Sequence, residues 1–460
     1  MARLPGTARA VGVAFVVGAC LSAFAAAVPE PAVAAPALPD AAVPKQPLPQ
    51  PPVPEALWVD PAKGDDRNPG TQQKPLKSIS AAIALLPDPL EQSVTIHLAA
   101  GTYTTTGGKT MAATRLELMR RMRPGVTVRL IGAGDATGGA SGGAAGTAGK
   151  NAGRSPDSAG GDYATILGWE SDTALIDARE GDWWLENVRI GTFTTRQRRG
   201  VEVAGPAHVT LRNVTFRQRS LSDAGIYAHR GGQVSLLGRV ALNEHLHAAA
   251  GKEHLHGGQP EDERPAAEPE TFCGIIATDH GLVRFREREG ASLELGNGSL
   301  SASYYGVIRL GCETARITSW NEQSNNLAIN NGGRIDLHNT TVTLDARQRR
   351  NTPVGLEHDG HVLAEGARLI IVSDNDSAIA LQKASTLACN DVELRGKYEY
   401  ALWASSGSMF VGGFRGDVGR IDATTGATIN IEKVTGRLIG PVTARHAARI
   451  SLPDRDVVPE

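Results

Sequence analysis

The sequence has few aromatic residues and almost no net charge. Phe, Trp and Tyr make up 5% of its 460 residues, whereas 53 residues are glycine. This balance suits short strands and many turns better than a large helical core. With 47 basic and 49 acidic residues the net charge is −2, so the chain lacks the basic excess with which proteins bind nucleic acid or anionic membranes. We therefore expect no nucleic acid partner.

Long apolar runs are absent after the amino-terminal segment. No later stretch reaches the roughly 18 apolar residues that span a bilayer. Residues 1–28 place Arg3 and Arg9 before an apolar run, which is the order of a secretory signal peptide. Two cleavage interpretations remain open: Ala23-Phe24-Ala25 fits a soluble product, whereas residues 17–20 resemble a lipobox with an acylated Cys20. We favour the soluble, secreted or periplasmic form over a lipid-anchored lipoprotein at the cell surface.

Cysteine is scarce, and three residues remain after the signal: Cys273, Cys312 and Cys389. An odd number leaves at least one of them unpaired within the chain. None lies in a CxxC pair or beside an obvious activating base, so we interpret them as small buried apolar residues rather than as nucleophiles.

Composition divides the rest of the chain into a linker, a large domain and a tail. Residues 29–56 are rich in Pro and Ala and predict an extended spacer. Residues 132–161 are rich in Gly and Ala, residues 244–271 are polar and contain histidine, and both are interpreted as insertions in a domain over residues 57–450. A tail covers residues 451–460. The spacing of Ile79, Ala82, Ile83 and Leu86 predicts a short helix with Ser78 as N-cap.

Beyond Asp172 the chain repeats a pattern of short apolar strand, polar turn and second alternating strand. First strands recur near Ile226, Ile275, Val307, Leu327, Leu356, Ile379, Leu402 and Ile421. A period of this size is typical of a solenoid, whose units bury their apolar faces only by stacking. Three short strands per repeat favour an all-β, single-stranded right-handed parallel β-helix of about ten coils. The predicted helix then covers the amino-terminal end of the core, and we expect a monomer.

The segment before and within the helix carries a family resemblance. Val59-Asp60-Pro61, Gly64-Asp65-Asp66, residues 68–71 and 74–79, and Ala100-Gly101-Thr102-Tyr103 resemble the first motif of right-handed parallel β-helix proteins in the pectate lyase superfamily. The specific match covers about 45 residues. We interpret Asp60, Asp65, Asp66 and Asn68 as turn formers rather than as a calcium site, because their spacing is not that of an EF-hand loop.

The resemblance implies an acidic extracellular polysaccharide as partner, bound along a groove and cleaved by lyase-like chemistry. Such chemistry needs a cation or Ca²⁺ beside the uronate carboxylate and a base. The paired aspartates and Gly-His-Gly of the family's glycosidases are absent, as is a clear calcium-binding aspartate array. No family catalytic residue is therefore carried over, and the cofactor is unknown, with calcium as one option.

Polar residues in and after the first strand of each repeat are the candidate site, because stacking aligns equivalent positions. We predict a catalytic role for His280, Arg309, His358 and Lys383, and substrate binding for His229, Asp279, Glu313, Asp359 and His361. The simpler alternative is that these are ordinary surface residues of a solenoid.

Three other features leave alternatives open. Glu244-His245-Leu246-His247 recurs as residues 253–256, which would allow a metal site on a rigid frame but lies in a predicted insertion. Arg415-Gly416-Asp417 is a tripeptide presented by some adhesins, so a noncatalytic, structural or adhesive protein is the competing function. The paired aromatics Trp183-Trp184 and Tyr304-Tyr305, with Trp403, are interpreted mainly as packing.

Overall fold

The computed structural model describes ten stretches of the chain, all in the unit that spans residues 53–460. They are residues 54–104, 115–134, 164–168, 174–192, 199–218, 224–242, 274–319, 325–346, 352–374 and 376–457. The predicted signal with Cys20, almost all of the linker, most of insertion 132–161 and all of insertion 244–271 lie outside these residues. The described part has no helix long and apolar enough to cross a membrane.

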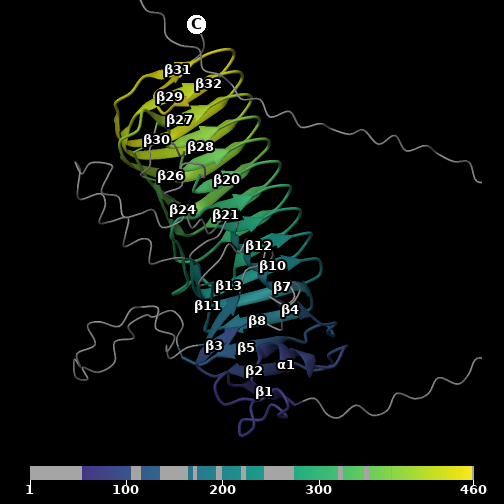
Figure 1. The fold of residues 1–460 in the computed structure, drawn as a ribbon. Coiled ribbons are helices and arrows are strands. Elements are labelled where there is room, and N and C mark those ends of the chain that lie inside the picture. The colour runs from purple at the N-terminus through teal and green to yellow at the C-terminus, as the bar shows by residue number, and fades with distance from the viewer. Residues whose placement is uncertain are drawn as a thin grey trace, which may run out of the picture. The chain divides into compact units, whose positions relative to one another are not determined.

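The fold is a parallel β-helix, as predicted, in which each coil contributes strands to three faces (Figure 1). Parallel strands joined by crossovers take a right-handed path in nearly all proteins. Face I is a 12-stranded sheet, so the described residues form twelve coils rather than about ten. Its strands are β4 (Leu116–Met119), β7 (Ala174–Glu180), β10 (Arg199–Ala204), β12 (Ala224–His229), β14 (Ile275–Ala277), β17 (Leu300–Ala302), β20 (Leu327–Ile329), β23 (Val354–Leu356), β25 (Ile379–Leu381), β27 (Tyr400–Ala404), β29 (Arg420–Ala423) and β31 (Val442–Ala444).

Faces II and III belong to one 21-stranded sheet, because several long strands run around the corner between them. Face II contains β1 (Ala56–Val59), β2 (Val94–Leu98), β5 (Val128–Gly132), β8 (Asp182–Glu186), β15 (Leu282–Phe285), β18 (Val307–Leu310), β21 (Arg334–His338) and β32 (Arg449–Leu452). Face III contains β3 (Gly101–Thr104), β6 (Ala164–Gly168), β9 (Val188–Thr192), β16 (Ser292–Leu295), β19 (Thr314–Thr318) and β22 (Thr341–Ala346). The strands shared by both faces are β11 (His208–Gln218), β13 (Gln233–Leu242), β24 (His361–Ser373), β26 (Thr386–Gly396), β28 (Met409–Val418) and β30 (Thr428–Leu438).

The core is a set of aliphatic columns along the helix axis. On face I, parallel register places one such side chain above the next in every coil from β4 to β25. All members of this column are buried: Leu116, Ile176, Val201, Ile226, Ile275, Leu300, Leu327, Val354 and Ile379. Alternate residues of each strand therefore point outward, and they supply the chemistry of the surface.

Both ends of the described solenoid carry a covering element. Helix α1 (Ile79–Ala84) buries Ile79, Ala82 and Ile83 in the core, and the Ser78 side chain accepts a hydrogen bond from the Ala81 N–H at 3.1 Å. The predicted helix and its N-cap are therefore confirmed, although it ends two residues earlier than expected. At the other end β33 (Arg455–Val457) pairs antiparallel with β32, so the segment after residue 450 contributes a strand.

The acidic residues of the first motif form turns, as predicted. Asp60 Oδ1 accepts hydrogen bonds from the backbone of Ala62 and Lys63 at 2.9 and 3.0 Å. Asp66 accepts from the N–H groups of Lys77 and Ser78 at 2.9 and 2.8 Å, and thereby holds the start of α1. Backbone capping of this kind satisfies carboxylates without a metal ion.

Candidate functional site

From β12 onward, each described coil passes from face I to face II through a four-residue turn whose two middle residues have positive φ; we call these nine turns the αL turns. This backbone costs an ordinary residue about 1–2 kcal/mol, and glycine pays no such penalty. Nevertheless, neither middle residue is glycine in five of these turns: Asp279-His280, Tyr304-Tyr305, His358-Asp359, Lys383-Ala384 and His446-Ala447. Unfavourable backbone that recurs at stacked positions is a reason to look for function there.

Hydrogen bonds between successive αL turns fix their register. In each case the backbone N–H of the second middle residue of one turn donates to the backbone carbonyl of the first middle residue of the next turn. These hydrogen bonds run from His280 to Tyr304 at 3.3 Å, from Asp359 to Lys383 at 3.0 Å and from Ala384 to Ser406 at 2.9 Å. Side chains distant in sequence are thereby stacked at about the 4.8 Å spacing of parallel strands. The αL turns thus form one polar row along the corner of the molecule.

Five of the nine predicted site residues lie in this row. His280 stacks on Tyr305 of the next coil, with ring centroids 5.5 Å apart and planes 27° apart. Lys383 Nζ lies 2.9 Å from His358 Nε2, so the ammonium group donates a hydrogen bond to the imidazole when the imidazole is neutral. Asp279 and Asp359 occupy the remaining predicted positions in these turns.

The other predicted residues lie elsewhere. Arg309 points outward from face II, and Arg309 Nε lies 3.3 Å from Asp336 Oδ2. His361 begins β24 on the same face, in register with Arg334. Glu313 lies in the turn between faces II and III, where it accepts a hydrogen bond from the Gly290 N–H at 3.2 Å. The four predicted catalytic residues therefore span five coils, about 19 Å along the axis, and do not converge on one point.

Face II carries an arginine patch in which the predicted Arg309 lies with two arginines that the sequence did not single out, Arg284 and Arg286. Parallel register places Arg284 between Ser235 and Arg309 on neighbouring strands. The Arg284 side chain is half-buried, and its Nε has no hydrogen-bond partner among the described residues. Burial and the charges of Arg286 and Arg309 lower the pKa of Arg284. A half-buried guanidinium whose Nε has no partner in the described part of the chain favours a bound anion.

Face I carries a second group that the sequence did not reveal, the face I ion cluster of Asp177, Arg179, Arg199, Glu202 and His229. Glu202 is 5% exposed, and it accepts from Arg179 at 3.0 Å and from His229 Nε2 at 2.9 Å. Burial raises the pKa of Glu202, but the hydrogen bonds from His229 and Arg199 and the charges of both arginines lower it to about 2. His229, predicted to bind substrate, is thus engaged within this cluster.

The ion cluster is internally paired. Arg199 Nη1 lies 2.9 Å from Glu202 Oε2, and Arg179 also pairs with Asp177. Arg199 further packs over the Tyr227 ring, with Cζ 3.8 Å from its centroid. A cluster whose carboxylates already have cationic partners stabilises face I and offers no free acid for catalysis.

The described cysteines lie in the core, whereas the paired aromatic residues divide between core and surface. Cys312 and Cys389 are buried free thiols, as the sequence predicts, whereas Cys273 lies outside the described residues. Trp183 is fully buried, but Tyr304 and Tyr305 are 59% and 66% exposed, so the expectation that they serve packing is wrong. Among the described residues no group of three or more His, Cys, Asp or Glu side chains has a metal-binding arrangement. The repeated Glu-His-Leu-His segments lie outside the described residues.

Comparison with known proteins adds limited information. Residues 62–172, about a quarter of the chain, match a family described as protein of unknown function (DUF1565), whose members are β-helix proteins. No curated protein matches the chain. One similar solved structure is the GH136 lacto-N-biosidase from Eubacterium ramulus, with 12% identity, 86% of this chain and 68% of that chain covered, and a TM-score of 0.30. Another is the complex of XylC with xylose, with 9% identity, 80% and 69% covered, and a TM-score of 0.29. TM-scores this low carry no argument about this chain.

Proposed function

We propose that this protein recognises an acidic extracellular polysaccharide through the arginine patch on face II. The observation that carries the proposal is the half-buried Arg284, whose Nε has no partner among the described residues and which lies beside Arg309. A uronate carboxylate or a sugar sulfate would supply the missing acceptors, and guanidinium groups bind such anions with paired hydrogen bonds.

The αL turns provide the second element of this site. His280 and Tyr305 form an exposed aromatic pair, and each precedes a patch arginine by four residues, His280 before Arg284 and Tyr305 before Arg309. Four strand residues span about 13 Å. A saccharide that stacks on the aromatic pair therefore extends over the arginines when it lies across face II.

The surrounding charges favour an anion overall. Arg334 adds a fourth guanidinium next to the patch. The described strands β15, β18 and β21 contain a single carboxylate, Asp336, which contacts both Arg309 and Arg334. The exposed residues 287–289 that follow Arg286 add two carboxylates and one guanidinium.

An extracellular ligand requires export, which the predicted signal peptide would provide.

The proposal is tested by binding measurements with acidic and neutral polymers. Polygalacturonate and alginate should bind, and dextran should not. Arg284→Gln should weaken binding by about tenfold or more, because hydrogen bonds to charged groups contribute roughly 1.5–3 kcal/mol. The same change should leave the thermal midpoint of the free protein unchanged or higher, since it removes a half-buried guanidinium whose Nε has no partner among the described residues.

Arg316→Gln is the matched control, because Arg316 is an exposed arginine on face III in the strand that follows Arg309. It should leave binding unchanged. Equal loss of affinity in both variants, or equal binding of neutral and acidic polymers, would refute recognition by the patch.

The two other functions considered from the sequence gain no support of their own. Arg415 and Asp417 lie in β28 and form ion pairs with Asp391 and Arg437, so no observation favours adhesion through this tripeptide. Lyase activity and membership of the pectate lyase superfamily remain predictions from the sequence. Loss of unsaturated uronate product in Lys383→Ala or Arg309→Ala is the measurement for that activity.

A further inference from the structure

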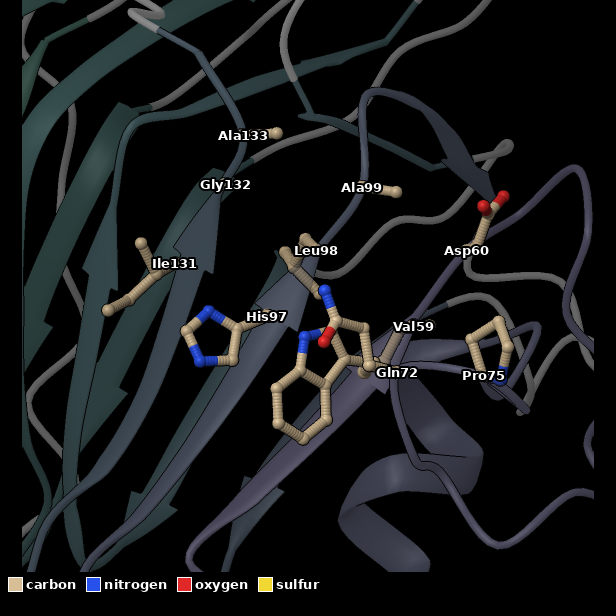
Figure 2. Close-up of a pocket in the computed structure, with 11 residues that line it drawn as sticks. Val59, Asp60, Gln72, Pro75, His97, Leu98, Ala99, Ile131, Gly132 and Ala133 are labelled. Atoms are coloured by element: carbon tan, nitrogen blue, oxygen red, sulfur yellow. The ribbon is translucent and has the colours of Figure 1, made fainter.

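A pocket of about 330 Å³ lies near the amino-terminal end of face II (Figure 2). It forms where the ends of β1, β2 and β5 meet the turns of the first motif, so it comprises residues 58–60, 97–99 and 131–133 with Gln72 and Pro75. A cavity of this volume is at the lower end of the range for ligand pockets, roughly 300–1,000 Å³. It therefore suits one small ring rather than an oligomer.

One wall of the pocket is aromatic. Trp58 and His97 are register partners on β1 and β2, and their rings stack with centroids 5.1 Å apart and planes 24° apart. Figure 2 shows the His97 ring and the Gln72 side chain among the residues that line the pocket. An indole held by a neighbouring ring presents a rigid apolar surface, against which the C–H face of a sugar packs well.

The pocket has few polar side chains, and two of them are free to contact a ligand. Within the described stretches, neither Trp58 Nε1 nor the Gln72 side chain has a hydrogen-bond partner. Asp60 Oδ1 binds the backbone of its own turn, and it is held in place by these contacts. An amide, an indole N–H and a carboxylate around an apolar wall match the hydroxyl groups and ring face of a pyranose.

The charge of the pocket separates its ligand from that of the arginine patch. Among the described residues that line the pocket, Asp60 alone carries a charge at neutral pH, and none is Lys or Arg. A carboxylate disfavours uronates and sulfated sugars, because like charges repel and no cation compensates. The two sites are also separate: five strand spacings, about 24 Å, lie between β2 and β15 on face II.

We infer that this pocket binds a single neutral pyranose ring, stacked on Trp58 and hydrogen-bonded by Gln72 and Asp60. This site is independent of the proposed function, since it uses other residues and takes the opposite class of sugar. A protein with both sites would contact a neutral sugar unit at one end of face II and acidic units further along it.

The experiment is saturation-transfer NMR and titration of the full chain with methyl glucoside, methyl galactoside and N-acetylglucosamine. At least one should bind with a dissociation constant on the order of 1 mM, the range of a few good contacts. Trp58→Ala should abolish this binding, and Gln72→Ala should weaken it at least fivefold. Gln73→Ala is the matched control, because Gln73 is adjacent, is also exposed and does not line the pocket.

Gln72→Ala alters an exposed side chain, so it tests the site even if Trp58→Ala fails to fold. Absence of binding by every neutral glycoside would overturn the inference. So would a uronate such as galacturonate that binds at this pocket as well as the neutral sugars, or a Gln73→Ala loss equal to that of Gln72→Ala. Binding of polygalacturonate is a separate result, since Arg284→Gln should leave the neutral glycosides bound.

Discussion

Glu202 makes the stability of the first coils depend on pH. Burial alone would raise its pKa, but His229, Arg199 and Arg179 lower it to about 2 from an ordinary value of 4.5. The folded pKa is therefore depressed, so this group stabilises the fold above pH 4.5, and the contribution is lost as pH falls toward 2. At 1.36 kcal/mol for each pKa unit, the full contribution at pH 7 is about 3 kcal/mol.

Substitution of Glu202 by Gln removes this contribution. The same linkage relation leaves the wild-type protein with about 1.4 kcal/mol from Glu202 at pH 3. We therefore expect Glu202→Gln to lower the free energy of unfolding by about 3 kcal/mol at pH 7 and by about half of that at pH 3. Urea denaturation of both proteins at the two pH values measures the difference. Hydrogen exchange of β7, β10 and β12 shows whether the loss of stability is confined to these coils, because repeat proteins can unfold in parts.

The control for this prediction is Glu294→Gln. Glu294 lies on face III, its side chain is 33% exposed, and its oxygen is 3.6 Å from Arg239. A pair of this kind contributes at most about 1 kcal/mol, so Glu294→Gln should destabilise the protein much less than Glu202→Gln at pH 7. If Glu202→Gln destabilised the protein equally at both pH values, or no more than the control, the reasoning about the ion cluster would be wrong.

Further predictions concern the thiols, the αL turns and the cap. Burial raises the pKa of Cys312 to about 11 and that of Cys389 to about 12, so neither should react with maleimide at pH 8 until urea is added; rapid labelling of the folded protein would contradict this. Ala384 has φ of 62°, and Ala384→Gly should raise the free energy of unfolding by about 0.5–1 kcal/mol, whereas a loss would show that the turn carries no strain. Asp66→Ala removes the acceptor of two backbone N–H groups at the start of α1. In urea denaturation it should lower the free energy of unfolding by about 1–3 kcal/mol. A smaller decrease would show that water replaces the carboxylate as acceptor.

The sequence was sufficient for the fold because the β-helix repeats a local rule. Each strand needs one aliphatic face and each turn a few small or polar residues, and both signals are visible within a single coil. The cap was predictable for the same reason, since Ser78 and the apolar spacing of residues 79–86 lie within a dozen residues. The coils of β4 and β7 escaped the count because 54 residues separate these two strands, and they include the Gly- and Ala-rich stretch that does not repeat.

The candidate site was predictable only in part, because it depends on contacts between coils. The prediction that polar residues after the first strand would stack is supported by the αL turns that hold His280, His358 and Lys383. Arg284 and Glu202 were missed, since their environment comes from residues that lie 25 and 27 positions away, Arg309 and His229. A single arginine or glutamate in an alternating strand resembles any solvent-exposed residue.

A signal for that register is nevertheless present in the sequence. The last residue of the αL turn is glycine in five coils, and in two of them, Gly281 and Gly306, an added Cβ would lie 2.1 Å from a carbonyl oxygen of the preceding coil. A residue with a side chain cannot approach so closely, so this glycine marks a fixed height in the stack. Arg284 and Arg309 both follow it by three residues. Alignment of the repeats on the turn glycine, rather than on the aliphatic positions that tolerate exchange, therefore places the two guanidinium groups side by side from the amino-acid sequence alone.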